Sequence, residues 1–346
     1  MFLIVLHHTI VHGVCDIHQG YATVATHYVN SGIAYTLGSG GTIGVYLFVL
    51  ITGYFMINSK ISFGKLLKLW LPIFFWSVLI TILFGNHINI RDLIEAIFPI
   101  LFGKYWFMTV YVFMYSLVPI LNIIVNNIKY KKEFLYFGLI SLFIIGGQAP
   151  KLELSMVASR LANFCIIYCI GAIIRKQSIL KNEEYVQLAK KLLIIFILVD
   201  TLGIFALTYV GGALGKVIFI KLSKDIVIHH WTMIGIAEAI TLFIVMGASN
   251  LGYHPMINRI ATCMFGIYLI SDNEYTQNFI WHQLFNMRHA LTYPWWLMIA
   301  YVLGVTIVVF VCCGILEYIR QLIFSKFEKW AYIKGNKFQE KIGLEF

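Results

Sequence analysis

Ten runs of apolar residues, separated by short polar segments, divide this 346-residue sequence. About 20 consecutive apolar residues let an α-helix cross a bilayer. In lipid, a spanning segment must satisfy every backbone polar group internally, as a helix does. We therefore predict an all-α polytopic membrane protein with about ten transmembrane helices. The runs cover residues 1–12, 42–57, 66–84, 105–125, 134–147, 161–174, 192–211, 231–249, 257–272 and 296–318.

The composition excludes the main alternatives. Hydrophobic residues make up 60% of the chain and charged residues 12%, whereas a soluble domain has about 45–50% apolar and about 25% charged residues. A soluble globular enzyme, a disordered chain and a secreted disulfide scaffold are therefore excluded. No Pro/Ser-rich linker interrupts the runs, so we expect one membrane domain over residues 1–320 and a basic cytoplasmic tail over residues 321–346.

The basic residues predict an orientation. If successive loops alternate between the two sides, 18 of the 26 Lys and Arg residues lie on the side that holds both termini. Because cytoplasmic loops are enriched in Lys and Arg, both termini are expected in the cytoplasm, with the protein in the cell membrane. The tail would lie on anionic lipid. The first run is too short to cross a bilayer, so we expect Met1 to be an internal methionine of a longer chain.

The segment HHTIVHG at residues 7–13 carries the strongest chemical signal. His8, His12 and Asp16 are spaced four apart, and they share a helix face if the helix continues that far. A histidine oriented by a carboxylate or by a second imidazole can act as a general base. His8 is the candidate base, and His12 and Asp16 are its candidate orienting residues. Two alternatives stay open: histidines at a helix end, and a His-rich metal site. We expect no bound metal or cofactor, because two histidines need further ligands.

Two other polar groups lie in or at the ends of apolar runs. Trp106, Tyr111 and Asn122 could bind substrate, although an interfacial aromatic belt gives the same pattern. A second set ends the run 257–272 and could equally be a helix end at the membrane surface; it consists of Ser271, Asp272 and Asn273. Asp200 and Glu238 lie within apolar runs, where an acid needs a partner or a proton. The sequence does not identify their partners.

Four segments in a fixed order resemble a known family. They are HHTIVHG, GVYLFVLITGYFMI at 44–57, YWFMTVYVFMYSLVPILN at 105–122 and FGIYLISDN at 265–273. Together they resemble the membrane-bound acyltransferase family 3, which O-acetylates cell-surface and exopolysaccharide sugars. The resemblance covers about residues 1–320. It differs in three places: the family's first-span arginine would precede Met1, Thr52 replaces a serine before Gly53, and Ser271 replaces a histidine.

The resemblance implies that the chain transfers an acetyl group. The donor would be acetyl-coenzyme A from the cytoplasm, and the acceptor a sugar hydroxyl on a surface polysaccharide or a lipid-linked glycan. His8 corresponds to the family's first-span histidine and would take the hydroxyl proton. The anionic phosphates of the donor would be attracted by Lys60, Lys65 and Lys68.

Two other functions remain open at this point. Ten spans with intramembrane acids also fit a transporter or flippase for lipid-linked sugars, although the sequence shows no inverted repeat. A non-catalytic relative that assembles with glycan enzymes is the third possibility. Transfer of label from acetyl-coenzyme A to glycan distinguishes the enzyme from both.

Overall fold

The computed structural model contains helices and no strand in the residues that it describes, namely 1–16, 21–85, 87–128, 133, 156–229, 233–249 and 252–343. Six segments are long and apolar enough to cross a membrane, and each of the six overlaps a predicted run. The six are Tyr28–Met56, Phe63–Phe84, Trp106–Asn127, Glu183–Ala213, Val217–Ala248 and Trp295–Lys341.

The remaining four runs have different outcomes. Three correspond to the shorter pair α1 (Phe2–His8) and η1 (Thr9–Val14), to α9 (Met156–Lys176) and to α13 (Pro255–Ser271). Run 134–147 lies outside the described residues. The fold is therefore all-α with several helices that can cross a membrane, and the number ten stays a prediction.

Two of the six segments consist of two successive helices. Helix α4 (Gly40–Met56) follows α3 (Tyr28–Gly38) with only Ser39 between them, and α12 (Met233–Ala248) follows α11 (Val217–His229). No apolar run predicted α3 or α11. Their glycines, lysines and hydroxyl residues lower the apolar content, but each helix buries a face against neighbouring helices.

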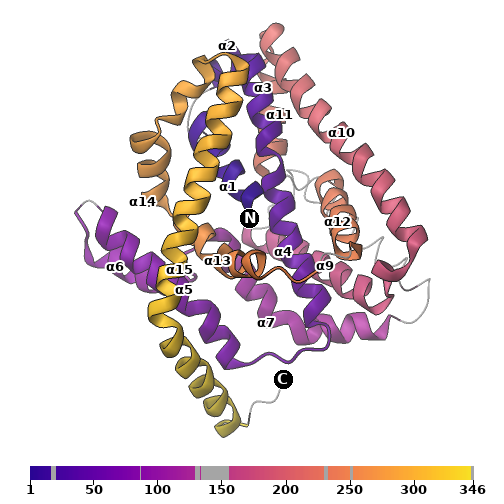
Figure 1. Ribbon diagram of the computed structural model, residues 1–346, viewed down its shortest axis with the longest axis vertical. Helices are drawn as coiled ribbons and strands as arrows, with labels where there is room; N and C mark the ends of the chain where they lie inside the picture. The colour runs from indigo at the N-terminus through magenta and orange to yellow at the C-terminus, as the bar shows by residue number, and fades with distance from the viewer. Residues whose placement is uncertain are drawn as a thin grey trace.

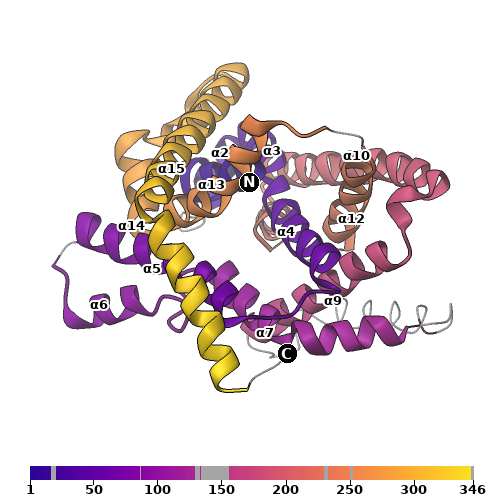
Figure 2. The same cartoon turned by 60° about the horizontal axis from the view of Figure 1, so that its bottom comes forward.

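The first helix lies in the middle of the molecule (Figures 1 and 2), where it packs against α3, α4, α13 and α15 (Trp295–Lys341). Val5 and Ile10 have no exposed surface. The helix approaches α4 closely because Gly41 and Gly44 have no side chain, and a Cβ at either position would meet His7 or Ile4. The candidate histidines are therefore carried by a helix enclosed in protein.

The C-terminal residues continue α15 rather than forming a separate segment. The helix passes through residue 320 without a break and ends at Lys341. Its last turns contact the start of α5 (Phe63–Phe84), since the Phe63 and Gly64 amides donate to Gln339 and Asn336 side chains at 2.8 and 3.1 Å. The basic tail thus packs on protein at its end. Whether it also lies on lipid stays a prediction.

Helices α4 and α9 meet through two glycines. A Cβ at Gly53 would collide with the backbone carbonyl of Tyr168, and one at Gly171 with that of Leu50. Gly53→Ala should therefore lower the melting temperature, since overpacking costs about 1–3 kcal/mol. Gly203→Ala on α10 (Glu183–Ala213) is the matched control, because nothing lies within 4 Å of its added methyl group. Equal melting temperatures for the two variants would contradict the close contact.

Candidate functional site

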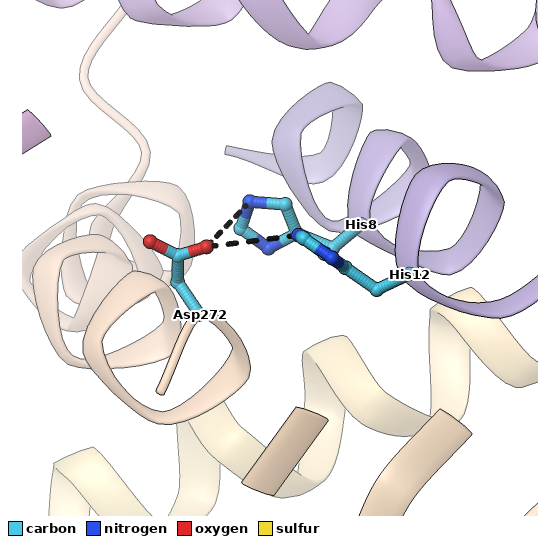
Figure 3. Close-up of side chains that lie close together, drawn as sticks. All are labelled: His8, His12 and Asp272. Carbon is cyan, nitrogen blue, oxygen red and sulfur yellow. Dashed lines mark ion pairs between the residues drawn. The ribbon is translucent and has the colours of Figure 1, made fainter. Parts of the chain in front are cut away.

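His8 and His12 lie on successive turns of the enclosed first helix. The helix widens after His8 into the π-helical segment η1, in which the Cys15 amide donates to the Ile10 carbonyl at 2.8 Å, five residues back. Such π segments are frequent at functional sites. The two imidazole rings lie 5.4 Å apart between centroids. They point to the same side of the helix, toward the end of α13 (Figure 3).

The carboxylate that faces these rings comes from Asp272, which caps the C-terminus of α13. Its Oδ1 lies 3.3 Å from His8 Nε2 and 4.0 Å from His12 Nε2 (Figure 3). Gln277, on the short helix α14 (Glu274–Gln277), donates from Nε2 to the Asp272 carbonyl at 3.0 Å. The short α14 turn therefore holds Asp272 in place, and His8 and Asp272 are both buried.

Ser271 and Asp272 contact the two nitrogens of the His8 ring. Ser271 Oγ lies 3.4 Å from His8 Nδ1 and 3.4 Å from the carbonyl of Tyr268. Because a carboxylate only accepts hydrogen bonds, we assign the proton of the neutral His8 ring to Nε2, which faces Asp272. Nδ1 is then the nitrogen that can accept a proton.

The two histidines and Asp272 lie at a cavity of about 290 Å³. His8, His12 and Asp272 form part of its wall, and Lys104, Glu274 and Gln277 belong to its polar part. The Lys104 ammonium lies 2.9 Å from Glu95 and 3.6 Å from Glu274, outside the spanning helices. Hydrogen bonds from Lys104 and Arg91 hold the pKa of Glu95 below its usual value, so these ion pairs persist at neutral pH.

A second, more apolar cavity of about 190 Å³ adjoins the first. The two share Ile4, Val45 and Tyr268 as lining residues, and the second extends to Met1 and Leu69. Leu69 lies in α5, one position after Lys68. Lys60 and Lys68 are exposed, and Lys65 donates to the Lys60 carbonyl at 2.8 Å. The three lysines thus lie in or just before the first turns of α5, the helix that lines the second cavity.

The substrate-binding candidates on α7 lie at different places in the structure. Trp106 begins α7 (Trp106–Asn127) and lines the first cavity, where the Arg160 guanidinium lies 4.5 Å from the centre of its ring. Tyr111 lines the second cavity, and its hydroxyl lies 3.0 Å from Thr52 Oγ1. Asn122 lies about 24 Å farther along α7 than Trp106. It bonds Tyr168 and the Met56 carbonyl at 2.7 and 3.1 Å, which makes it a helix-packing residue.

The spacing argument for Asp16 was wrong. It required a helix that continues to residue 16, but η1 ends at Val14 and Cys15 leaves the helical conformation. Asp16 instead accepts from Arg288 at 2.7 Å and lies 3.4 Å from His282 Nε2. Asn273 is likewise occupied: its amide donates to Tyr105 at 2.8 Å, and its Oδ1 caps α14 by accepting from the Tyr275 amide at 3.0 Å.

Arg160, Tyr268 and Gln277 line the same cavity and were not singled out from the sequence. Arg160 directly precedes the run 161–174 in the sequence, and it belongs to α9. A charged residue at the start of an apolar run, three positions before Asn163, was the available signal. Among the described residues, His8, His12 and Asp272 also form a group whose ligand atoms lie within 4.8 Å of one another. A metal ion would fit that spacing.

Comparison with known proteins matched one family. A family model described as an acyltransferase domain matches residues 1–318. Neither the curated proteins nor the solved structures gave a match. The matched region contains every residue of the site described above.

Proposed function

Because the chain belongs to acyltransferase family 3, we propose that it moves an acetyl group from acetyl-coenzyme A to a sugar hydroxyl of a surface polysaccharide or a lipid-linked glycan. Membership supports an acyltransferase activity, and the apolar helices indicate a multi-pass membrane protein. The observation that carries the finer proposal is the convergence of His8, His12 and Asp272 on one cavity. In this proposal the protein lies in the cell membrane with both termini in the cytoplasm.

His8 acts as the general base in this reaction. Its imidazole ring takes the hydroxyl proton while the sugar oxygen attacks the thioester carbonyl carbon. The tetrahedral intermediate then collapses, the carbon–sulfur bond breaks, and the leaving thiolate takes the proton back from His8. General-base assistance of this kind contributes about 10²–10⁴-fold in rate. Asp272, at 3.3 Å, stabilises the imidazolium between the two proton transfers.

The two adjoining cavities divide the substrates between them. The polar first cavity, with Trp106, Lys104 and Glu274, suits a sugar. The apolar second cavity suits the arm that carries the acetyl thioester, and Lys60, Lys65 and Lys68 lie near the end where the phosphates of the donor would remain. The reacting atoms meet beside Tyr268, which lines both cavities.

Label transfer tests the proposal. Membranes that contain the protein are incubated with acetyl-coenzyme A labelled in the acetyl group and with glycan acceptors, and label is measured in the glycan. We expect label to appear in the glycan as an alkali-labile ester. If membranes with the protein and membranes without it give equal label on every acceptor, the proposed function is wrong.

Trp106→Ala should raise KM for the acceptor roughly tenfold and leave kcat almost unchanged. The indole offers a flat apolar face in the cavity, and losing contact worth about 1.4 kcal/mol weakens binding tenfold. Trp106→Phe keeps most of that face and should retain most of the affinity. The exposed Trp296 provides the control Trp296→Ala, with no expected effect. A fall in kcat with KM constant would contradict a binding role.

Replacing Lys60, Lys65 and Lys68 together with glutamine should raise KM for acetyl-coenzyme A several-fold. The increase should shrink at high salt, since screening already weakens attraction between exposed charges. Lys326, Lys329 and Lys337 allow a control with the same change in net charge on α15. If the two triple variants behave alike, the effect is one of net charge, and a local donor site at the start of α5 is contradicted.

A further inference from the structure

A long apolar groove lies on the other side of the α13–α14 segment from the cavity of the candidate site. It has a volume of about 450 Å³ and runs between α5, α15 and the π-helical segment η3 (Asn278–Leu284). Its lining extends along α15 from Val308 to Phe324. That stretch measures about 24 Å, against a hydrocarbon thickness of about 30 Å. The shape suits one extended chain.

The groove opens toward the surface that faces lipid. Its exposed lining residues include Leu83, Leu284, Leu316 and Ile323, at least one from each of the three walls. Helices α5 and α15 are both long and apolar enough to cross a membrane. The groove is therefore continuous with the hydrocarbon region of the bilayer, and its occupant enters sideways from the lipid.

The positive charge of Arg320 in the groove is paired with carboxylates. Arg320 is its one charged lining residue, and its guanidinium holds Glu317 through two hydrogen bonds of 2.8 Å and Glu328 through one of 2.5 Å. Glu317 also accepts from Trp76 Nε1 at 2.7 Å. Since these partners satisfy the guanidinium, the groove selects an uncharged hydrocarbon chain.

The groove and the candidate site share a thin wall. Ile270 and Thr276 line the groove, and between them lie Ser271, Asp272 and Asn273. On α14 the next residue, Gln277, lines the polar cavity instead. A helix is about 10 Å across, so a polar head attached to a chain in the groove could reach across α14 to Lys104 and Glu274.

We propose that this groove seats the hydrocarbon chain of a lipid-linked acceptor, so that the sugar carried by the lipid enters the cavity of His8 from the membrane. The inference rests on the proposed function, and it selects the lipid-linked glycan over a free polysaccharide as the acceptor class. The chain is held by apolar contact along α5 and α15, and it presents the sugar at the level of α14.

Two groove variants test the assignment in a transfer assay. Leu316→Trp and Leu83→Trp place an indole in the groove at exposed positions that tolerate a larger side chain. We expect each to raise KM at least tenfold for a glycan on a long polyprenyl carrier, and to change KM less than twofold for the same glycan on a short water-soluble aglycone. Ile315→Trp is the control, because Ile315 is exposed on α15 outside the groove lining.

A second measurement does not depend on catalysis. A polyprenyl phosphate with a diazirine in its chain is cross-linked to the protein in nanodiscs, and the adducts are mapped by mass spectrometry. We expect adducts on residues 75–84 and 308–324, reduced at least fivefold in Leu316→Trp. The exposed face of α10 reports contact with bulk lipid. Adducts spread equally over α10 and the groove, or equal KM changes for both acceptors, would overturn the proposal. Groove adducts without acetyl transfer to either acceptor would instead contradict the proposed function.

Discussion

His8→Gln is expected to lower kcat for acetyl transfer by about 10²–10⁴-fold, the range that general-base assistance contributes. Glutamine has nearly the reach of histidine, but its side chain cannot accept a proton from a hydroxyl at neutral pH. KM for both substrates should change little, because the cavity keeps its other walls. The measurement is steady-state transfer by purified protein in nanodiscs, at equal amounts of folded protein.

His289→Gln is the matched control, since His289 is exposed in the short helix η4 (Met287–Thr292). It should behave like the wild-type protein. A His12→Gln variant separates the two ring positions: His12 Nε2 lies 4.0 Å from Asp272 Oδ1, so its loss should cost less than that of His8. If kcat falls further in the His12 variant than in the His8 variant, the assignment of His8 as the base is contradicted.

Asp272→Asn is expected to lower kcat by about 10²-fold with KM for the acceptor nearly constant. The substitution keeps the shape of the side chain and the Gln277 bond to the backbone, but it removes the charge that stabilises the imidazolium. An effect on kcat alone indicates an interaction made in the transition state. The assay is the same steady-state transfer, with thermal unfolding as the test of folding.

Asp272→Glu provides the second arm of this test. It keeps the charge and moves it by one methylene group, so part of the lost kcat should return. If the glutamate and asparagine variants are equally inactive and both unfold at lower temperature, Asp272 has only a structural role. If asparagine leaves kcat unchanged, the carboxylate does not assist the base.

The architecture was largely accessible from the sequence because hydrocarbon imposes length and composition on a spanning helix. Six runs overlap helical segments that meet both conditions. The enclosed α1, by contrast, packs against α3, α4, α13 and α15, which are partners that no local sequence pattern identifies. The close pairing of α4 with α9 depends on Gly53 and Gly171, which are far apart in sequence, and no local pattern predicts it.

Only part of the site could be predicted from the sequence, because its residues come from segments far apart in the chain. His8 and His12 could be paired from their spacing on one helix, whereas Asp272 meets them from a distant segment that the sequence marked only as a polar helix end. The expectation for Asp16 relied on an unbroken α-helix, and the π-helical turn ended that helix early. Asn122 had the polarity of a binding residue, but helix packing uses both ends of its amide.

Chemical rescue of His8→Gly by imidazole is the most direct test of a proton-accepting ring at this position. The variant leaves a space beside Asp272 in a cavity of about 290 Å³, which free imidazole can enter. Acetyl transfer should fall at least 100-fold in the variant and rise again, saturably, as imidazole is added, with no rescue of Asp272→Asn. Wild-type transfer by His8→Gly without imidazole would contradict the account.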